Sequence, residues 1–163
     1  VLFSLVVIFM YILIRFRKMS YSIGAVAAVF HDVLIVLALF SILYGRLPFS
    51  LEIDQAFIAA ILTVIGYSLN DTVVVFDRVR EYFGIKSGSR DDIVNAALNS
   101  TLSRTINTSL TTFFVLLIIF LFGGEVIRGF MFALMIGVVV GTYSSLFIAT
   151  PIMVDTLKKE DDK

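Results

Sequence analysis

Long apolar segments alternate with short polar connections along this chain and set its organisation. Within each segment the apolar residues run continuously, without the strict alternation of a half-buried strand. A spanning helix needs about 20 such residues, and inside lipid only helices and closed barrels satisfy the backbone. We therefore interpret the chain as one all-α domain, a polytopic membrane helix bundle with five transmembrane helices over about 1–14, 23–45, 54–76, 105–122 and 127–152.

The polar connections between the apolar segments contain residues that predict helix ends and turns. Residues 82–104 form the longest polar stretch, in which the segment from Gly84 to Gly88 breaks the preceding helix and Ser89 followed by Asp92 predicts a new N-cap. Apolar residues then recur at helical spacing and predict a short amphipathic helix on the cytoplasmic interface, at Val94, Ala97, Leu98 and Leu102. Gly123-Gly124 predicts a tight outer turn between spans four and five, and we expect the tail from Lys158 to fray.

Composition agrees with a membrane protein. The 163 residues are 59% hydrophobic and 16% charged, against about 45–50% and 25% in soluble domains. The absence of Cys excludes thiolate metal sites and thiol catalysis, and the single His31 excludes a histidine cluster. Zero net charge gives no reason to expect nucleic acid. No Walker loop, zinc-helix motif or nucleophile elbow occurs, so we expect neither an enzyme nor a cofactor.

The basic residues are distributed unequally between the two sides of the predicted bundle. Arg46 and Arg128 lie on one side, and the other 11 of the 13 Lys and Arg residues lie in 15–22, 77–104 and 152–163. The positive-inside rule makes these three segments cytoplasmic. The chain begins at the apolar residue Val1, and we expect it to be a piece of a longer polypeptide whose N-terminal part lies outside the cytoplasm.

Asp71 is an ionisable residue inside the third apolar span. An ionised carboxyl at that depth costs about 2.5–3.5 kcal/mol on insertion scales, so an intramembrane acid is by default a candidate functional residue. Gly66, Tyr67, Asn70 and Asp71 are related to one another by steps of three and four residues, and we expect them to share a polar face that turns inward to protein or water. The alternative is that Asp71 is a structural hydrogen-bond partner between helices.

The fourth span carries a second polar face, formed by Arg104, Asn107, Thr108 and Thr111. Because Asp71 lies near the cytoplasmic end of one helix and Arg104 at the cytoplasmic start of the next, we expect the two to meet. A carboxyl group beside a guanidinium releases its proton more readily than one beside an apolar wall, so a switch between these settings moves a proton. The alternatives are that Arg104 is a snorkelling anchor and that the hydroxyls of residues 108–112 bond their own helix.

Two further features need an explanation. His31-Asp32 lies within the second span, and the two residues point about 100° apart on a helix. They form either a neutral histidine bonded within the bundle or a water-lined polar site that supports Asp71. The fifth span carries small residues at every fourth position, which predict close helix packing, at Ala133, Gly137, Gly141, Ser145 and Ala149.

Four motifs together resemble one family of membrane proteins. Residues 66–81, GYSLNDTVVVFDRVRE, resemble the third-from-last span of the SecF family of protein-export membrane subunits. Residues 104–112, RTINTSLTT, are similar to the start of the next SecF span. Residues 137–151, GVVVGTYSSLFIATP, resemble the last span, and His31-Asp32-Val33 resembles the HDV of an earlier one. The four motifs occur in family order and cover nearly the whole chain.

The resemblance implies a fold, a location and partners. It implies the last five helices of a six-helix SecF half, in the resistance-nodulation-division superfamily, within the bacterial inner membrane. The implied partners are SecD, separate or fused, the SecYEG channel, the motor SecA and the preprotein. The complex is expected to use the proton-motive force to assist translocation. The family's proton-transport residues fall on Asp71, Arg104 and Thr108, with a further essential Asp supplied by SecD.

Two other functions fit parts of the pattern. A superfamily transporter that exports a small molecule or lipid would also have an intramembrane acid, but would be expected to lack the combination of residues 66–81 and 104–112. An intramembrane aspartyl protease would use two carboxylates on neighbouring helices, and Asp32 with Asp71 superficially qualifies. Neither residue has the GxGD context of that class.

Overall fold

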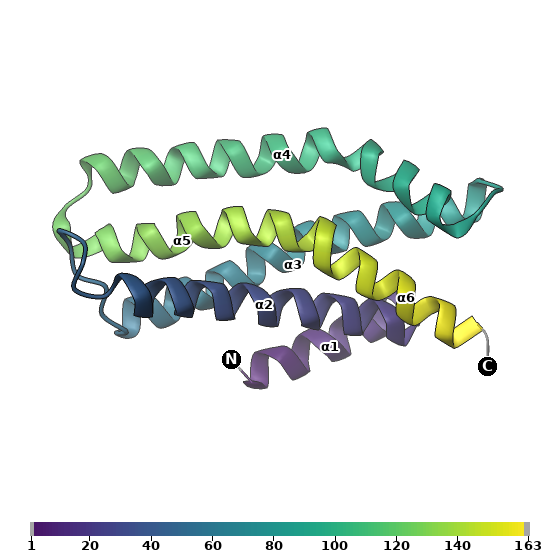
Figure 1. The fold of residues 1–163 in the computed structure, drawn as a ribbon, viewed down its shortest axis with the longest axis horizontal. Helices are drawn as coiled ribbons and strands as arrows, with labels where there is room; N and C mark the ends of the chain where they lie inside the picture. Colours follow the sequence, from purple (N-terminus) through teal and green to yellow (C-terminus); the bar gives the residue numbers. More distant parts are fainter. Residues whose placement is uncertain (1, 162–163) are drawn as a thin grey trace.

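The computed structural model describes residues 2–161, and all of its regular elements are helices. The long helices lie side by side as an elongated bundle (Figure 1). The elements are α1 (Leu2–Phe16), α2 (Met19–Leu43), α3 (Gln55–Ile85), α4 (Arg90–Phe122), α5 (Glu125–Ser144), the π-helix η1 (Ser145–Ala149) and α6 (Thr150–Asp161).

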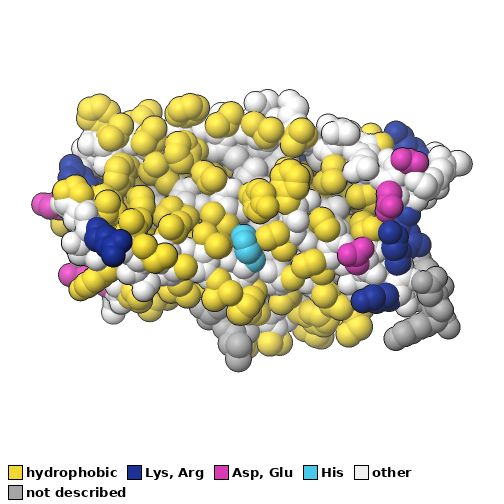
Figure 2. Space-filling model, viewed as in Figure 1, with side chains coloured by type: hydrophobic (Ala, Val, Ile, Leu, Met, Phe, Trp, Pro, Cys, Tyr) yellow, Lys and Arg dark blue, Asp and Glu magenta, His cyan; other side chains and the backbone are white. Residues whose placement is uncertain are grey.

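Four helical stretches are long and apolar enough to cross a membrane. They are α2, α3, α4 and the continuous helix formed by α5, η1 and α6, while α1 is a shorter apolar helix. Figure 2 shows the corresponding surface, a broad belt of hydrophobic side chains with charged residues gathered toward its two ends. The predicted class, an all-α polytopic membrane bundle, is confirmed.

Two predicted boundaries differ from the structure, and one is confirmed. The break predicted between Gly84 and Gly88 is present, since α3 ends at Ile85 and α4 begins at Arg90. The amphipathic helix and the fourth span are one helix, α4, rather than two. The predicted fraying from Lys158 is wrong, since α6 extends to Asp161 and buries Leu157; residues 162–163 lie outside the described residues. Apolar contacts along the bundle explain the longer helices, because most helix stability in proteins comes from tertiary packing.

The helix ends show why these elements begin where they do. Ser89 caps α4, since its Oγ accepts from Asp92 N at 3.2 Å and donates to Asp92 Oδ2 at 2.6 Å. Asp54 caps α3 by accepting from Phe57 N at 2.8 Å. The predicted turn at Gly123-Gly124 is present and makes α4 and α5 an antiparallel hairpin, visible in Figure 1.

Close packing between α3 and α5 forms the centre of the bundle. The small residues predicted as a stripe on the last span are all buried, among them Gly137 and Gly141. A Cβ on Gly137 would overlap the side chain of Val64, and one on Gly141 would lie 3.0 Å from Ser68 Cβ. The backbones of α3 and α5 therefore lie close together at Gly137 and Gly141. Small residues allow such close approach between membrane helices.

Aromatic residues fix the charged end of the bundle where α1, α2 and α3 meet. The rings of Phe16 and Tyr21 stack at 4.9 Å, and both contact Phe76 edge-on at 5.9 and 5.2 Å. Arg15 and Asp77 form an exposed ion pair beside them, with Nη2 and Oδ2 3.0 Å apart. The rings provide most of the attachment, since exposed ion pairs contribute little.

Gly137→Ala should destabilise the protein, because the new methyl overlaps both Cγ atoms and the Cβ of Val64 and forces the α3 and α5 backbones apart. Overpacking of this kind costs about 1–3 kcal/mol. The measurement is the thermal unfolding temperature of the detergent-solubilised parent protein. Gly84→Ala is the control, because a Cβ there meets nothing within 4 Å, and it should leave the temperature unchanged or slightly higher. Equal unfolding temperatures for the two variants would contradict the close α3–α5 contact.

Candidate functional site

Asp71 lies midway along α3 and points into the junction with α4 and α5. The residue is 4% exposed, and its Oδ2 has no hydrogen-bond partner among the described residues. The hydroxyls of Ser109 and Thr142 lie beside the carboxyl group, and Arg104 is within electrostatic reach. A buried polar oxygen without a partner is costly. Asp71 is therefore an incompletely satisfied group at the centre of a polar cluster, here called the Asp71 site: Asp71, Ser109, Thr142 and Arg104.

The two hydroxyls of the Asp71 site join α4 to α5. Ser109 Oγ and Thr142 Oγ1 are 2.5 Å apart. Each is also placed to donate to its own helix, Ser109 to Thr105 O at 2.9 Å and Thr142 to Val138 O at 2.8 Å. Because a hydroxyl has one proton and two lone pairs, it can donate to a backbone carbonyl, to the other hydroxyl or to the carboxylate. The pair can thus adapt to either protonation state of Asp71.

Arg104 approaches the site from the surface. Arg104 is exposed. Together with Asp77 and Glu81 it lines a groove of about 310 Å³ between α3 and α4. The groove lies toward the charged end of the bundle, between residues 74–81 of α3 and residues 100–104 of α4. The arrangement gives Asp71 a nearby positive charge that is itself accessible, so the interaction between the two can be screened or displaced.

The structure separates residues that we expected to share one inward face. Asp71 is buried, Tyr67 is half-buried, and Gly66 and Asn70 are exposed, so the four residues do not share one buried face within this chain. Neighbouring residues on a helix point about 100° apart, and Asn70 therefore faces outward when Asp71 faces the core. Tyr67 donates from its hydroxyl to Thr112 Oγ1 at a long 3.5 Å.

The polar face predicted on α4 lies on the surface of the bundle, at Arg104, Asn107, Thr108 and Thr111. The interior face carries Thr101, Thr105 and Ser109 instead. Thr108 donates to Arg104 O and Thr111 donates to Asn107 O, each at 2.9 Å. These bonds agree with the alternative interpretation, in which the hydroxyls of residues 108–112 bond their own helix. The four-residue spacing from Thr101 to Ser109 was the signal that the sequence offered for the true interior face.

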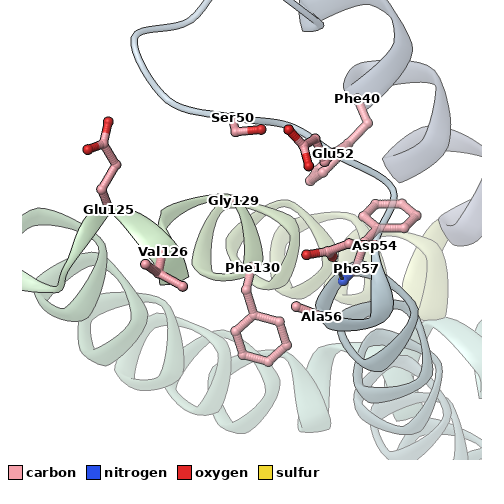
Figure 3. A pocket seen from close by; sticks show the side chains of 10 residues that line it. All are labelled: Phe40, Ser50, Glu52, Asp54, Ala56, Phe57, Glu125, Val126, Gly129 and Phe130. Carbon is pink, nitrogen blue, oxygen red and sulfur yellow. Dashed lines mark hydrogen bonds between the residues drawn. The ribbon is translucent and has the colours of Figure 1, made fainter.

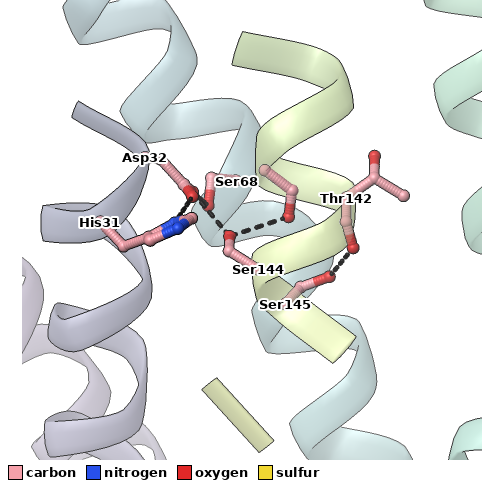
Figure 4. Close-up of polar contacts among 7 residues, drawn as sticks. His31, Asp32, Ser68, Thr142, Ser144 and Ser145 are labelled. Atoms are coloured by element: carbon pink, nitrogen blue, oxygen red, sulfur yellow. Dashed lines mark hydrogen bonds and ion pairs between the residues drawn. The ribbon is translucent and has the colours of Figure 1, made fainter. Parts of the chain in front are cut away.

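Asp32 is the centre of a second buried polar cluster, drawn in Figure 4, here called the Asp32 cluster: Asp32, His31, Ser68 and Ser144. Asp32 is fully buried, and its Oδ2 accepts from Ser68 Oγ at 2.5 Å and from Ser144 Oγ at 2.7 Å. His31 Nδ1 lies 3.1 Å from Asp32 Oδ1 despite the divergent directions of the two side chains. Sequence reasoning identified the pair but missed the two serines, which had no distinguishing neighbours.

The end of the bundle that holds the Gly123-Gly124 turn also contains an acidic pocket. Figure 3 shows Glu52, Asp54 and Glu125 around a hollow of about 360 Å³ that Phe40 and Phe57 also line. Asp54 is already engaged as the cap of α3. Among residues 2–161, no group of three or more acidic or histidine side chains is arranged to hold a metal ion.

The fold and its two polar clusters define a class, the polytopic helical membrane proteins that carry a buried carboxyl group at a helix junction. Over residues 1–159 the chain matches the family "Protein export membrane protein SecD/SecF, C-terminal". The chain belongs to this family, which confirms the SecF resemblance.

Curated relatives agree with this assignment. The protein translocase subunit SecF of Rhodothermus marinus is 62% identical over 156 residues, covering 95% of this chain and 50% of the relative. SecF of Petrotoga mobilis is 46% identical, covering 98% and 51%. The chain thus spans about half the length of these relatives. They are named as translocase subunits and not as enzymes, in agreement with the expectation that the chain is not an enzyme.

Solved structures have the same fold. A crystal structure of SecDF in a super-membrane-facing form superposes with a TM-score of 0.88 at 38% identity, covering 99% of this chain and 21% of that one. A second SecDF structure, from Thermus thermophilus, gives a TM-score of 0.79 at 39% identity, covering 92% and 20%. The bundle is therefore the arrangement found within a larger membrane protein.

Proposed function

We propose that this chain is the proton-coupling membrane region of a SecF subunit, and that it uses the proton-motive force to assist preprotein translocation across the bacterial inner membrane. The observation that carries the proposal is the Asp71 carboxyl group. It is 4% exposed, lacks a partner for Oδ2 among the described residues, and lies at the junction of three helices beside Arg104. A carboxyl group that is poorly satisfied in one state is suited to exchange a proton between two states.

The proposed cycle follows from the charges at the site. When Asp71 is ionised, it attracts Arg104 and accepts hydrogen bonds from the Ser109 and Thr142 hydroxyls. When it is protonated, the attraction to Arg104 disappears and its own O–H donates to one of these hydroxyls. The two states favour different packing of α3 against α4, and a proton can shift such an equilibrium only by its different affinity for them. One proton crossing the membrane supplies about 2.3 kcal/mol per 100 mV, enough to bias the packing.

The orientation follows from the basic residues. In this proposal the segment 77–104 and the C-terminal tail are cytoplasmic, because 11 of the 13 Lys and Arg residues lie with them and in 15–22. The groove beside Arg104 then opens toward the cytoplasm, and the acidic pocket around Glu52 and Glu125 faces the outside. A proton would arrive from the outer side and leave through the groove.

The exposed polar face supports a SecD partner. Asn70 on α3 and Thr108 on α4 are exposed on the surface of the bundle, where exposed apolar residues such as Leu62 and Ile106 also lie. Polar groups at membrane depth face protein or water, so a partner helix must cover them. The SecDF structures that superpose with this chain extend well beyond it, which leaves room for such helices. We further propose, from the family alone, that the assembly serves SecYEG, SecA and the preprotein.

The protease alternative is disfavoured by the separation of the two acids. An aspartyl protease needs two carboxyl groups that share one proton. Here Asp32 accepts from Ser68 and Ser144, whereas Asp71 faces Ser109 and Thr142. No hydrogen bond joins the two carboxyl groups among the residues that the structure describes. The small-molecule transporter is disfavoured by the naming of the relatives as translocase subunits.

Asp71→Asn should abolish the stimulation of export by a proton gradient, because the amide keeps the size of the side chain but cannot ionise. The assay is translocation into inverted membrane vesicles that contain the full SecD–SecF complex, with and without a proton gradient. Loss of most of the stimulation, about tenfold or more, is expected for a group that carries the coupled proton. Asp155→Asn is the matched control, since Asp155 is an exposed acid on α6. Undiminished gradient-dependent export in Asp71→Asn would refute the proposal.

Cysteine labelling tests the proposed partner face. The chain has no Cys, so a single Cys at Thr108 or Ile118 reports on its own position. We expect Thr108→Cys to react with a maleimide roughly fivefold more slowly or worse when full-length SecF is assembled with SecD, since the centre of an interface excludes water. The control is Ile118→Cys, an exposed apolar position on α4, which should react equally with and without SecD. Equal rates for Thr108→Cys in both samples would show that SecD does not cover this face.

A further inference from the structure

The Asp32 cluster contains a buried carboxyl group that the proposed proton cycle does not use. Asp32 lies midway along α2 and is completely buried, and its three polar contacts come from three separate positions: His31 on α2, Ser68 on α3 and Ser144 on α5. A carboxyl group taken out of water is costly unless hydrogen bonds replace its hydration. Here two hydroxyls converge on one oxygen and the imidazole lies against the other, so the cost is offset only while these contacts persist.

The Asp32 cluster differs electrically from the Asp71 site. Around Asp32, α2 provides one group that can be charged, His31, while α3 and α5 provide only hydroxyls in direct contact. Around Asp71, α4 provides Arg104 and hydroxyls, and α5 a hydroxyl. Within residues 2–161, no Arg or Lys is among the direct polar contacts of Asp32. Its hydrogen bonds to Ser68 and Ser144 instead join α2 to α3 and α5.

The two clusters share one helix interface. Ser68 and Asp71 are three residues apart on α3, and Thr142 and Ser144 are two apart on α5. The backbone between them is tightly packed, because a Cβ on Gly141 would lie 3.0 Å from Ser68 Cβ. A rotation or slide of α3 or α5 that breaks the contacts of Asp32 must therefore also move Asp71 relative to Thr142.

A π-helical turn lies between α5 and α6, next to the Asp32 cluster. The π-helix η1 begins directly after Ser144, and Thr150 Oγ1 donates back to Ser145 O at 3.0 Å across it. π-turns inside α-helices are uncommon and are frequent at functional sites. Asp32 binds the residue at the border of this turn, so it holds α5 in register on the side where the Asp71 site lies.

We propose that Asp32 is a positioning residue for Asp71: its carboxyl group joins Ser68 of α3 to Ser144 of α5 and thereby fixes the interface that holds the Thr142 hydroxyl at the Asp71 site. This inference rests on the proposed proton-carrying function of Asp71. It assigns no proton transfer to Asp32 itself. It follows that substitutions in the Asp32 cluster should change the proton affinity of Asp71, although Asp71 itself is unchanged.

The test measures the protonation of Asp71 directly in the full SecD–SecF complex in proteoliposomes. A hydrophobic carbodiimide modifies protonated carboxyl groups inside the bilayer, and mass spectrometry locates the modification on Asp71 as a function of pH. The variants are Asp32→Asn, Ser68→Ala and Ser144→Ala. The two serine variants are decisive, because they leave the charge of Asp32 in place, so a shift cannot come from the loss of that charge.

We expect each serine variant to move the pH of half-modification of Asp71 by about 0.5 unit or more, roughly a threefold change in proton affinity. The two effects should also be non-additive, since a second substitution finds the connection already broken. Ser22→Ala is the matched control: Ser22 is a buried serine of α2 whose Oγ has no hydrogen-bond partner among the described residues. It should leave the pH of half-modification unchanged.

The possible results separate the two proposals. If Asp71 in the unsubstituted complex is not modified at any pH, the proton-carrying function fails, and the positioning function fails with it. If Asp71 is modified normally and the serine variants leave its pH profile unchanged, only the positioning function fails. Asp32→Asn adds a second comparison, and should it prevent assembly, the serine variants still decide the question.

Discussion

Two acidic side chains are buried inside the helix bundle, and the cost of burying them governs how the helices pack. A buried carboxyl group needs hydrogen-bond partners from the protein. The two buried carboxyl groups, of Asp32 on α2 and Asp71 on α3, lie in neighbouring helices. Asp32 is well supplied with hydrogen bonds, whereas Asp71 has an oxygen without a partner among the described residues. The contrast distinguishes a group suited to hold helices together from one suited to change its protonation state.

Small residues make this arrangement possible. Gly137 and Gly141 let α5 approach α3 so closely that the hydroxyls of Thr142 and Ser144 reach the two acids. Larger side chains there would separate the helices and leave both carboxyl groups in a gap. The close approach and the polar clusters thus depend on one another: the packing brings the hydroxyls into place, and the hydrogen bonds across α2, α3 and α5 stabilise the packing.

The arrangement around Asp71 also explains how a small chemical change can reach far along the protein. Arg104 lies in a groove between α3 and α4, and Ser109 joins α4 to α5 through Thr142. Three helices therefore meet at one ionisable group, and each contributes a contact whose strength depends on the charge of that group. The Asp32 contacts hold α2, α3 and α5 together at the same time, so in the proposed cycle α4 is the helix left free to move.

The class of fold and the importance of Asp71 could both be inferred from the sequence alone. Continuous apolar segments required helices in lipid, and an acid within one of them was costly enough to identify Asp71. The four-residue stripe through Gly137 and Gly141 predicted close packing because it depends only on helical spacing. The capping pair Ser89 and Asp92 was equally readable, since a cap is a local interaction.

Which polar side chains meet depends on how the helices pack, and the sequence does not give this packing. Spacing gives the relative directions of residues on one helix, but not the rotation of that helix against its neighbours. Asn70 was therefore expected on one face with Asp71 and is exposed instead, while Ser109 and Thr142 were not singled out and lie beside Asp71. The importance of Asp32 was hidden for the same reason, because its partners Ser68 and Ser144 come from helices that the chain reaches 36 and 112 residues later.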